Sequence, residues 1–211
     1  MKRSRVMVIV AIVAGSLLLA GPLWSATDPL WTKTFNFQLN NCAIVVGGVA
    51  ASTTALIVCG TAYNAAIDTG DIGFIKAFDL VTGDLKWQDT LTAGANRNGF
   101  YSLAVVGNTV LVDAYSSSYD PASFIYTLNQ STLRAYNADA TGGSTISPIW
   151  VVPQNAAPLN FGPTNLVTAN NRVFVVRQEN GVSDPAGSGN CIVQAYQVGA
   201  PIVAPTSLLL E

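Results

Sequence analysis

The sequence predicts an all-β protein, and three observations favour that fold class. Short runs of β-branched and aromatic residues alternate with Gly, Asn, Asp and Ser, which is the pattern of strands and turns. After its first residues, the chain keeps no helical apolar period, because Asn-Gly, Gly-Asn and Asn-Asn steps interrupt each candidate. Three stretches of the chain also resemble one another, which indicates a repeated β-sheet unit.

The first residues have the layout of a secretory signal. Cations at positions 2, 3 and 5 precede an apolar run from Val6 to Ala20, and small residues follow at Ser25 and Ala26. This order is typical of a cleavable signal peptide, so we expect residues 1–26 to direct export to the periplasm or the extracellular space. The apolar run is shorter than the roughly 20 residues of a membrane span. An uncleaved anchor, which would keep the protein at a membrane, is the alternative.

The charge of the chain argues against a nucleic-acid partner. Of its 211 residues, 50% are hydrophobic and only 10% are charged, whereas about a quarter is usual for charged residues. Removing the three cations of the signal leaves seven Lys and Arg against 12 Asp and Glu, a net charge of about −5. A negative chain without a basic stripe repels DNA and RNA.

The chain contains three cysteines, Cys42, Cys59 and Cys191. Export permits a disulfide, and the odd number leaves at least one thiol over. Cys42 and Cys59 are close enough in sequence to lie on adjacent strands, so a Cys42–Cys59 bridge is one interpretation. The other is that all three are small buried core residues.

Three segments align as repeats. In each of them Ala precedes an aromatic residue that Asp, Asn or Gln follows, and the aromatics are Phe78, Tyr136 and Tyr196. We expect repeat units at about 30–91, 92–152 and 153–200, so that 27–200 is the repeat region and 201–211 a C-terminal tail. The clearest hairpin ends at Trp87, and its turn contains Gly83, since Gly takes a positive φ without steric cost.

The hairpin sequence Ala-Phe-Asp-Leu-Val-Thr-Gly-Asp-Leu-Lys-Trp, residues 77–87, resembles the repeat of quinoprotein (PQQ-type) β-propellers. In that family Ala-x-Asp-x-x-Thr-Gly-x-x-x-Trp joins the third and outer strands of a blade. The second repeat keeps Trp150 but has Asn137 in place of the Asp, and the third repeat lacks the Trp. The resemblance covers about residues 30–198. It implies a partial or half β-propeller of about three four-stranded antiparallel blades, and it implies no particular activity.

Residues 30–35 look like an outer strand with its Trp but without the strands that should precede it. The resemblance implies that this segment completes the third blade, as propellers commonly close with strands from both chain ends. Blade-packing roles are then implied for six aromatic residues: Trp31, Trp87, Trp150, Phe78, Tyr136 and Tyr196. A ligand site lined by the three Trp side chains is the alternative.

Three blades are too few for a ring, because propellers typically have four to eight. Three arrangements stay open. Two chains complete a six-bladed ring as a homodimer, or the sheets stack in an open arc, or the chain is a shortened relative of a longer protein.

No group of residues predicts catalysis. The chain has no histidine, which excludes Ser-His-Asp and Cys-His machinery and His-ligated metal sites. Asp68, Asp71 and Asp79 could offer oxygen ligands to calcium, but turn formation accounts for them better. We therefore expect no catalytic residue, cofactor or metal. The polar stretch 115–121 is expected to be a loop, either a binding loop or solvated filler.

These expectations combine into an exported, non-enzymatic scaffold or binding module that presents loops to a protein or glycan partner. One alternative is a fragment or decayed relative of a larger propeller protein. A quinone-dependent dehydrogenase is suggested by the family name alone, since such enzymes use longer chains that form a complete ring and hold calcium.

Overall fold

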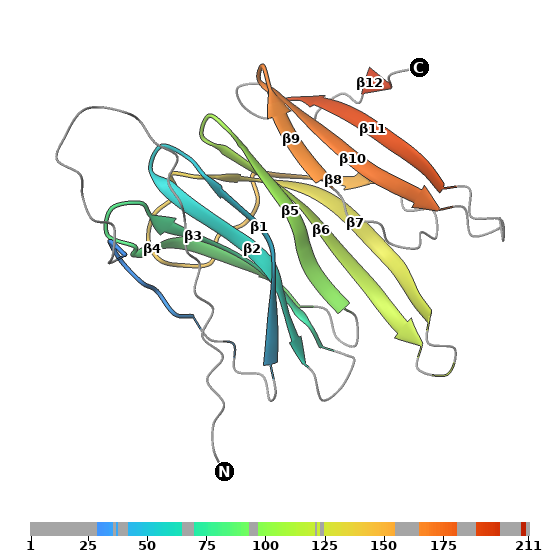
Figure 1. The fold of residues 1–211 in the computed structure, drawn as a ribbon, viewed down its shortest axis with the longest axis horizontal. Coiled ribbons are helices and arrows are strands. Elements are labelled where there is room, and N and C mark those ends of the chain that lie inside the picture. Colours follow the sequence, from blue (N-terminus) through green and yellow to red (C-terminus); the bar gives the residue numbers. More distant parts are fainter. Residues whose placement is uncertain are drawn as a thin grey trace, which may run out of the picture.

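The computed structural model describes residues 29–35, 37, 42–64, 70–92, 97–120, 122, 125–154, 165–180, 189–198 and 208–209. Within these residues the chain forms strands and no helix, which confirms the all-β fold class (Figure 1). The first sheet contains β1 (Cys42–Ala51), β2 (Ala55–Asn64), β3 (Ile72–Asp79) and β4 (Leu85–Leu91). The second contains β5 (Arg97–Val106), β6 (Thr109–Asp120), β7 (Ile125–Asn137) and β8 (Trp150–Gln154). The third contains β9 (Asn165–Ala169), β10 (Arg172–Asn180), β11 (Gly189–Gln197) and β12 (Leu208–Leu209).

Each sheet is an antiparallel meander whose strands follow one another in chain order. The three sheets lie in a row, with the second between the other two, and none of them closes on itself (Figure 1). The first strands of the sheets run along one side of the row, where β5 contacts both β1 and β9. This is the partial propeller-like arrangement that the repeats imply.

The three sheets repeat one another in register as well as in topology. We use the alanine before each repeat aromatic as a marker for comparing the sheets. In each sheet it pairs with a residue of the last strand, which we call the outer strand: β4, β8 or β12. The pairs are Ala77 with Trp87, Ala135 with Trp150 and Ala195 with Leu208. A backbone hydrogen bond also recurs in each sheet. The N–H of the residue two places after the repeat aromatic donates to a carbonyl in the turn between the first two strands of the same sheet. These bonds are Leu80 N–H to Thr54 O (3.2 Å), Ala138 N–H to Asn108 O (2.9 Å) and Val198 N–H to Asn171 O (3.0 Å).

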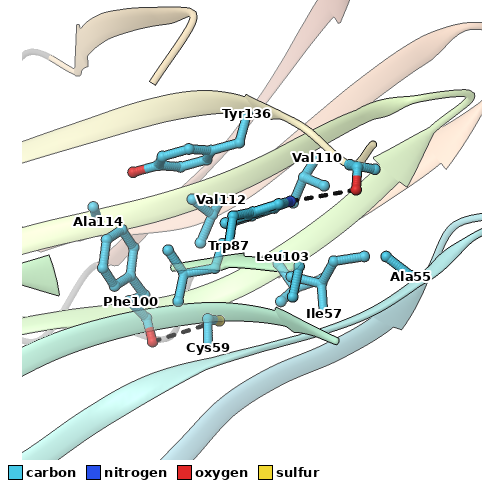
Figure 2. Packing of buried hydrophobic residues seen from close by; sticks show 13 residues of the cluster. Ala55, Ile57, Cys59, Trp87, Phe100, Leu103, Val110, Val112, Ala114 and Tyr136 are labelled. Atoms are coloured by element: carbon cyan, nitrogen blue, oxygen red, sulfur yellow. Dashed lines mark hydrogen bonds between the residues drawn. The ribbon is translucent and has the colours of Figure 1, made fainter. Parts of the chain in front are cut away.

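Trp87 connects the first sheet with the second (Figure 2). Its ring is fully buried and stacks on Tyr136, with ring centroids 5.5 Å apart and an interplanar angle of 17°. Its indole N–H donates to the carbonyl of Ala138 at 3.3 Å. Burying two large rings and satisfying the indole donor is a strong source of stability between the sheets. Apolar side chains of β2, β3, β5 and β6 complete this core: Ile57, Ile75, Phe100, Leu103, Val110 and Val112.

A second, smaller core lies between the second and third sheets. Leu111 and Leu133 face Val173 and Val175 there, and Tyr196 completes the buried cluster. Trp150 is half-buried and packs against this cluster. The third sheet is therefore joined to the second through the same kind of face that joins the second to the first.

The segment at residues 30–35 does not complete the third sheet, so that prediction was wrong. Its side chains lie against the first sheet, where the Trp31 indole donates to the carbonyl of Leu80 at 3.1 Å and the Phe35 ring lies 5.6 Å from Phe74. The position beside β11 is taken by β12. The reason is apolar burial, since Trp31 and Phe35 cover a sheet face that would otherwise be exposed.

The turn between β3 and β4 has the geometry that its sequence predicts. The Asp79 carboxylate accepts the backbone N–H groups of Val81 and Thr82, each at 2.9 Å. These bonds lower the pKa of Asp79, because they favour the ionised form. Gly83 has a φ of 70°, and a Cβ there would lie 2.6 Å from the Trp31 ring. This glycine is thus needed both for the turn and for the contact with Trp31.

The structure corrects one further expectation, and two others lie mostly outside the described residues. The polar stretch at 115–121 is not a loop up to Asp120, because β6 continues to that residue. The signal at 1–26 lies outside the described residues, as does the tail at 201–211 except for β12. The described part of the chain contains no helix with the length and apolar character of a membrane span.

The register also excludes the Cys42–Cys59 bridge. Cys42 lies opposite Asn64, five positions along β2 from Cys59, and five positions of a strand span roughly 16 Å. A disulfide needs Cα atoms less than about 7 Å apart. Cys59 is instead a free thiol in the core, 3.9 Å from the carbonyl oxygen of Phe100 (Figure 2).

Burial gives Cys59 a measurable effect on alkaline stability. Desolvation raises the pKa of its thiol from 9.0 to about 12, so above pH 9 the unfolded chain releases a proton that the folded chain retains. The stabilisation is present below that pH and is lost as the pH rises. We expect the wild type to lose about 1 kcal/mol more than Cys59→Ala between about pH 8 and pH 10. Urea unfolding of both proteins at the two pH values measures this, and equal losses would contradict it.

Candidate functional site

Polar and aromatic side chains gather where β2 ends and where β3 and β5 begin. We call Tyr63, Tyr101 and Tyr115, together with Arg97 and Asp71, the tyrosine cluster. Tyr63 is the second-last residue of β2, Asp71 immediately precedes β3, and Arg97 is the first residue of β5. The antiparallel meanders bring the ends of β2, β4 and β6 and the starts of β3, β5 and β7 to this same end of the first two sheets (Figure 1).

The three tyrosines form one hydrogen-bonded group. Tyr115 is buried and stacks on half-buried Tyr101, with ring centroids 4.2 Å apart and an interplanar angle of 14°. Burial raises the pKa of Tyr63 and of Tyr101 above the usual range, and side-chain hydrogen bonds with Tyr115 raise both further. The phenols of Tyr63 and Tyr101 therefore stay neutral at physiological pH and can donate and accept hydrogen bonds.

An ion pair between Arg97 and Asp71 lies beside the three tyrosines. The Arg97 Nε lies 3.5 Å from the Asp71 carboxylate, which is almost completely buried. The Arg97 guanidinium also lies over the Tyr63 ring, 5.8 Å from its centroid. The Asn98 amide donates to the backbone carbonyl of Asp71 at 3.2 Å. A buried carboxylate is costly without a cation beside it, so this pair holds the start of β5 against the end of the β2–β3 connection.

Two glycines let the first and second sheets approach closely at the cluster. A Cβ on Gly99 would lie 2.2 Å from the Thr61 hydroxyl and 2.3 Å from the Tyr115 ring. A Cβ on Gly73 would lie 3.0 Å from the Cα of Gly99. The backbones of β3 and β5 thus nearly touch, and this approach brings Tyr63 of one sheet beside Tyr115 of the other.

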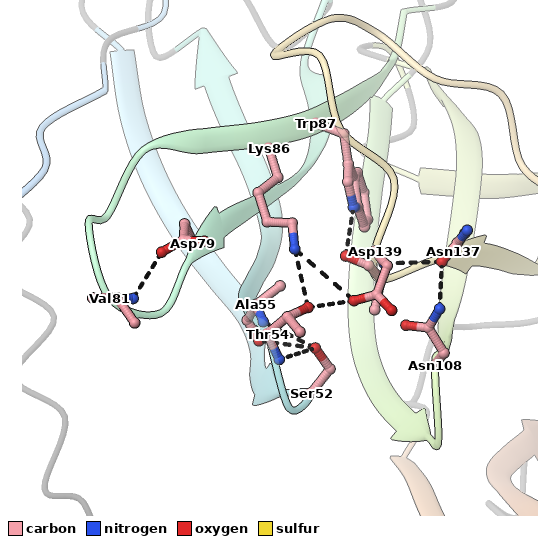
Figure 3. A network of polar contacts seen from close by, with 11 residues as sticks. Ser52, Thr54, Ala55, Asp79, Val81, Lys86, Trp87, Asn108, Asn137 and Asp139 are labelled. Carbon is pink, nitrogen blue, oxygen red and sulfur yellow. Dashed lines mark hydrogen bonds and ion pairs between the residues drawn. The ribbon is translucent and has the colours of Figure 1, made fainter.

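A different polar network ties the two sheets together at their opposite end (Figure 3). Lys86 of β4 donates to the Thr54 hydroxyl at 3.0 Å and lies 3.9 Å from the Asp139 carboxylate. Thr54 also donates to Asp139. Since Thr54 belongs to the β1–β2 turn and Asp139 follows β7, this network links the two sheets. Each of its groups has a partner within the network, so its role is structural.

The residues suggested for calcium do not come together. Asp68 lies outside the described residues, and Asp71 and Asp79 lie at opposite ends of β3. In the part of the chain that the structure describes, no group of three or more His, Cys, Asp or Glu could hold a metal ion.

The three tryptophans do not form one site either. Each packs on a different sheet: Trp31 lies 6.5 Å from Phe78, Trp87 stacks on Tyr136, and Trp150 packs on the cluster that contains Tyr196. The structure brings four of the six aromatic residues named for blade packing together in two pairs, Trp31 with Phe78 and Trp87 with Tyr136, and it places Trp150 against the cluster that contains Tyr196.

No protein-family model and no curated protein matches this chain. The tyrosine cluster was not found from the sequence, because its members come from four separate places in the chain. One signal was visible: Gly73 and Gly99 lie inside strands, where glycine often marks a close backbone approach.

The close approach at Gly99 can be tested by adding one methyl group. We expect Gly99→Ala to lower the free energy of unfolding by about 1–3 kcal/mol, because the new Cβ has no room beside Thr61 and Tyr115. The matched control is Gly107→Asn in the open β5–β6 turn. Gly107 has a φ of 57° and nothing within 4 Å of an added Cβ, and Asn170 adopts φ 50° in the β9–β10 turn. Thermal unfolding that shows both variants equally stable would contradict the proposed packing.

Proposed function

We propose that this chain is an exported, non-enzymatic scaffold of PQQ-like β-propeller repeats that binds a protein or glycan partner through the tyrosine cluster. The observation that carries the proposal is the preformed group of half-buried Tyr63, Tyr101 and Arg97 at the end of two sheets. Tyr and Arg are enriched at the centres of recognition surfaces.

The chemistry of the cluster suits both partner classes. A tyrosine ring offers an apolar face for the CH groups of a sugar or for an aliphatic side chain, and its hydroxyl offers a hydrogen bond. The stacking of Tyr101 on Tyr115 and the contact of Arg97 with Tyr63 hold these side chains in place before a partner arrives. Such preorganisation lowers the entropy cost of binding.

Export and low charge agree with this role. The N-terminal pattern of cations, apolar run and small residues favours secretion. With only 10% charged residues, we expect the surface to depend on Ser, Thr, Asn and Gln for its polarity, and adaptable side chains of this kind are common in binding surfaces. The proposal needs no cofactor and no metal.

Binding can be measured on arrays of defined oligosaccharides and of purified exported proteins. We expect at least one member to bind the wild type and to lose tenfold or more in affinity with Tyr63→Ser or Tyr101→Ser, because each change removes a half-exposed ring. Val81→Ser, in the exposed β3–β4 turn at the other end of the sheets, is the control that should bind normally.

Two outcomes would contradict the proposal. One is the absence of binding to any member, and the other is equal binding by the tyrosine variants and the wild type. A rise in melting temperature on adding PQQ with calcium would favour the dehydrogenase instead, since a ligand that binds the folded state stabilises it.

A further inference from the structure

The third sheet exposes positions that are buried on the other two. Ile57 of the first sheet and Leu111 of the second each lie opposite the marker alanine of the next strand, and both are fully buried beneath the following sheet. The equivalent residue of the third sheet is Phe174, opposite Ala195. Phe174 is only half-buried, and Val167, its partner on β9, is 56% exposed.

The next row of the same face repeats this difference. Ile75 and Leu133 hold equivalent places on β3 and β7 and are fully buried, whereas Val193 holds that place on β11 and is 41% exposed. We call Val167, Phe174 and Val193 the third-sheet end face. No described segment of the chain covers it in the way that one sheet covers the next.

The first sheet has an end face of the opposite kind. On the second sheet, Phe100 and Leu103 of β5 are buried against the first sheet. Their register equivalents on β1 are Val46 and Val49, which are 36% and 42% exposed. Val46 and Val49 are the first-sheet end face. The two end faces are therefore the two halves of an interface that occurs twice inside the chain.

Trp31 shows which element belongs beside the first-sheet end face. The Trp31 indole donates to the carbonyl of Leu80, and its ring lies beside Phe78. Trp87 makes the equivalent contacts on the second sheet, where it donates to the carbonyl of Ala138 and stacks on Tyr136. Trp87 stands on the outer strand of a neighbouring sheet. Residues 29–35 thus hold the place of an outer strand, but the other strands of that sheet are not beside them.

The third sheet has the complementary arrangement. Its outer strand, β12, pairs with β11 at only two positions, Gln194 and Ala195. Leu208 takes the register position that Trp87 and Trp150 take in the other sheets. The edge of β11 is therefore covered by a much shorter strand than the edges of β3 and β7.

We propose that a second copy of this chain covers both end faces. The third sheet of each copy packs on the first sheet of the other, and the 29–35 segment of the second copy replaces β12 beside β11, with its Trp opposite Ala195. The contact is the same at both junctions, so two copies close on themselves and leave neither end face exposed. The residues named for both end faces are apolar, while the charged side chain of Arg172, two positions before Phe174 on β10, is exposed beside them.

Light scattering after size exclusion tests this directly on the exported chain at micromolar concentrations. We expect twice the mass of one chain for the wild type. Val193→Asp should raise the dissociation constant by roughly 100-fold, because it buries an unpaired charge in an apolar contact. The control Val151→Asp changes a valine that is 43% exposed on β8 of the second sheet, which forms neither end face, and should stay dimeric. Val167→Asp is a second variant of the same face, and circular dichroism confirms that each variant is folded.

Three results would overturn the proposal. A wild-type monomer at these concentrations would show that the end faces are not self-complementary. A folded Val193→Asp dimer as tight as the wild type would place the contact elsewhere on the molecule. A continuous series of larger masses would show that the head-to-tail contact does not close.

Discussion

The stacking of an outer-strand tryptophan on the aromatic residue of the next sheet is the contact on which the rest of the structure depends. Trp87 is covered by Tyr136, and its indole bond to the carbonyl of Ala138 fixes how far the first sheet can slide along the second. With that position fixed, β5 lies against β1 and β2, and Gly99 meets Thr61 and Tyr115. The tyrosine cluster is thus a consequence of a contact at the other end of the same strands.

The interface between the first two sheets changes character along its length. Around Trp87, Val110 and Ile57, which are fully buried, its interior is apolar, and the network of Lys86, Thr54 and Asp139 lies at the surface of that end. Towards the tyrosine cluster it accepts buried polar groups, and these have partners: Tyr136 donates to the Asp89 carboxylate at 2.7 Å, and Asp71 lies beside Arg97. Buried polar groups cost stability unless they are paired, so the apolar end supplies most of the stability while the polar end supplies a defined surface.

The sequence was sufficient for the features that depend on local chemistry. Alternating apolar residues and turn signals predicted the strands, and Asp79 with Gly83 predicted the β3–β4 turn, because these patterns act within a few residues. Features that depend on contacts between distant segments could not be predicted. The predicted place of residues 30–35 was wrong, because burial of Trp31 and Phe35 on the first sheet outweighs completion of the third. The prediction of a Cys42–Cys59 disulfide was wrong because the distance between two residues in sequence does not fix the register of their strands.

A double-mutant cycle on Trp87 and Tyr136 measures the central contact most directly. The four proteins are the wild type, Trp87→Leu, Tyr136→Phe and the double variant, and urea unfolding gives the free energy of each. Tyr136→Phe keeps the ring and removes only the hydroxyl, so Tyr136→Leu is run in parallel to remove the stack as well. Our account predicts a coupling energy of about 1 kcal/mol or more for the Leu cycle and a smaller one for the Phe cycle. Additive losses in the Leu cycle would show that the two rings do not hold the sheets together as a pair, and they would contradict the account.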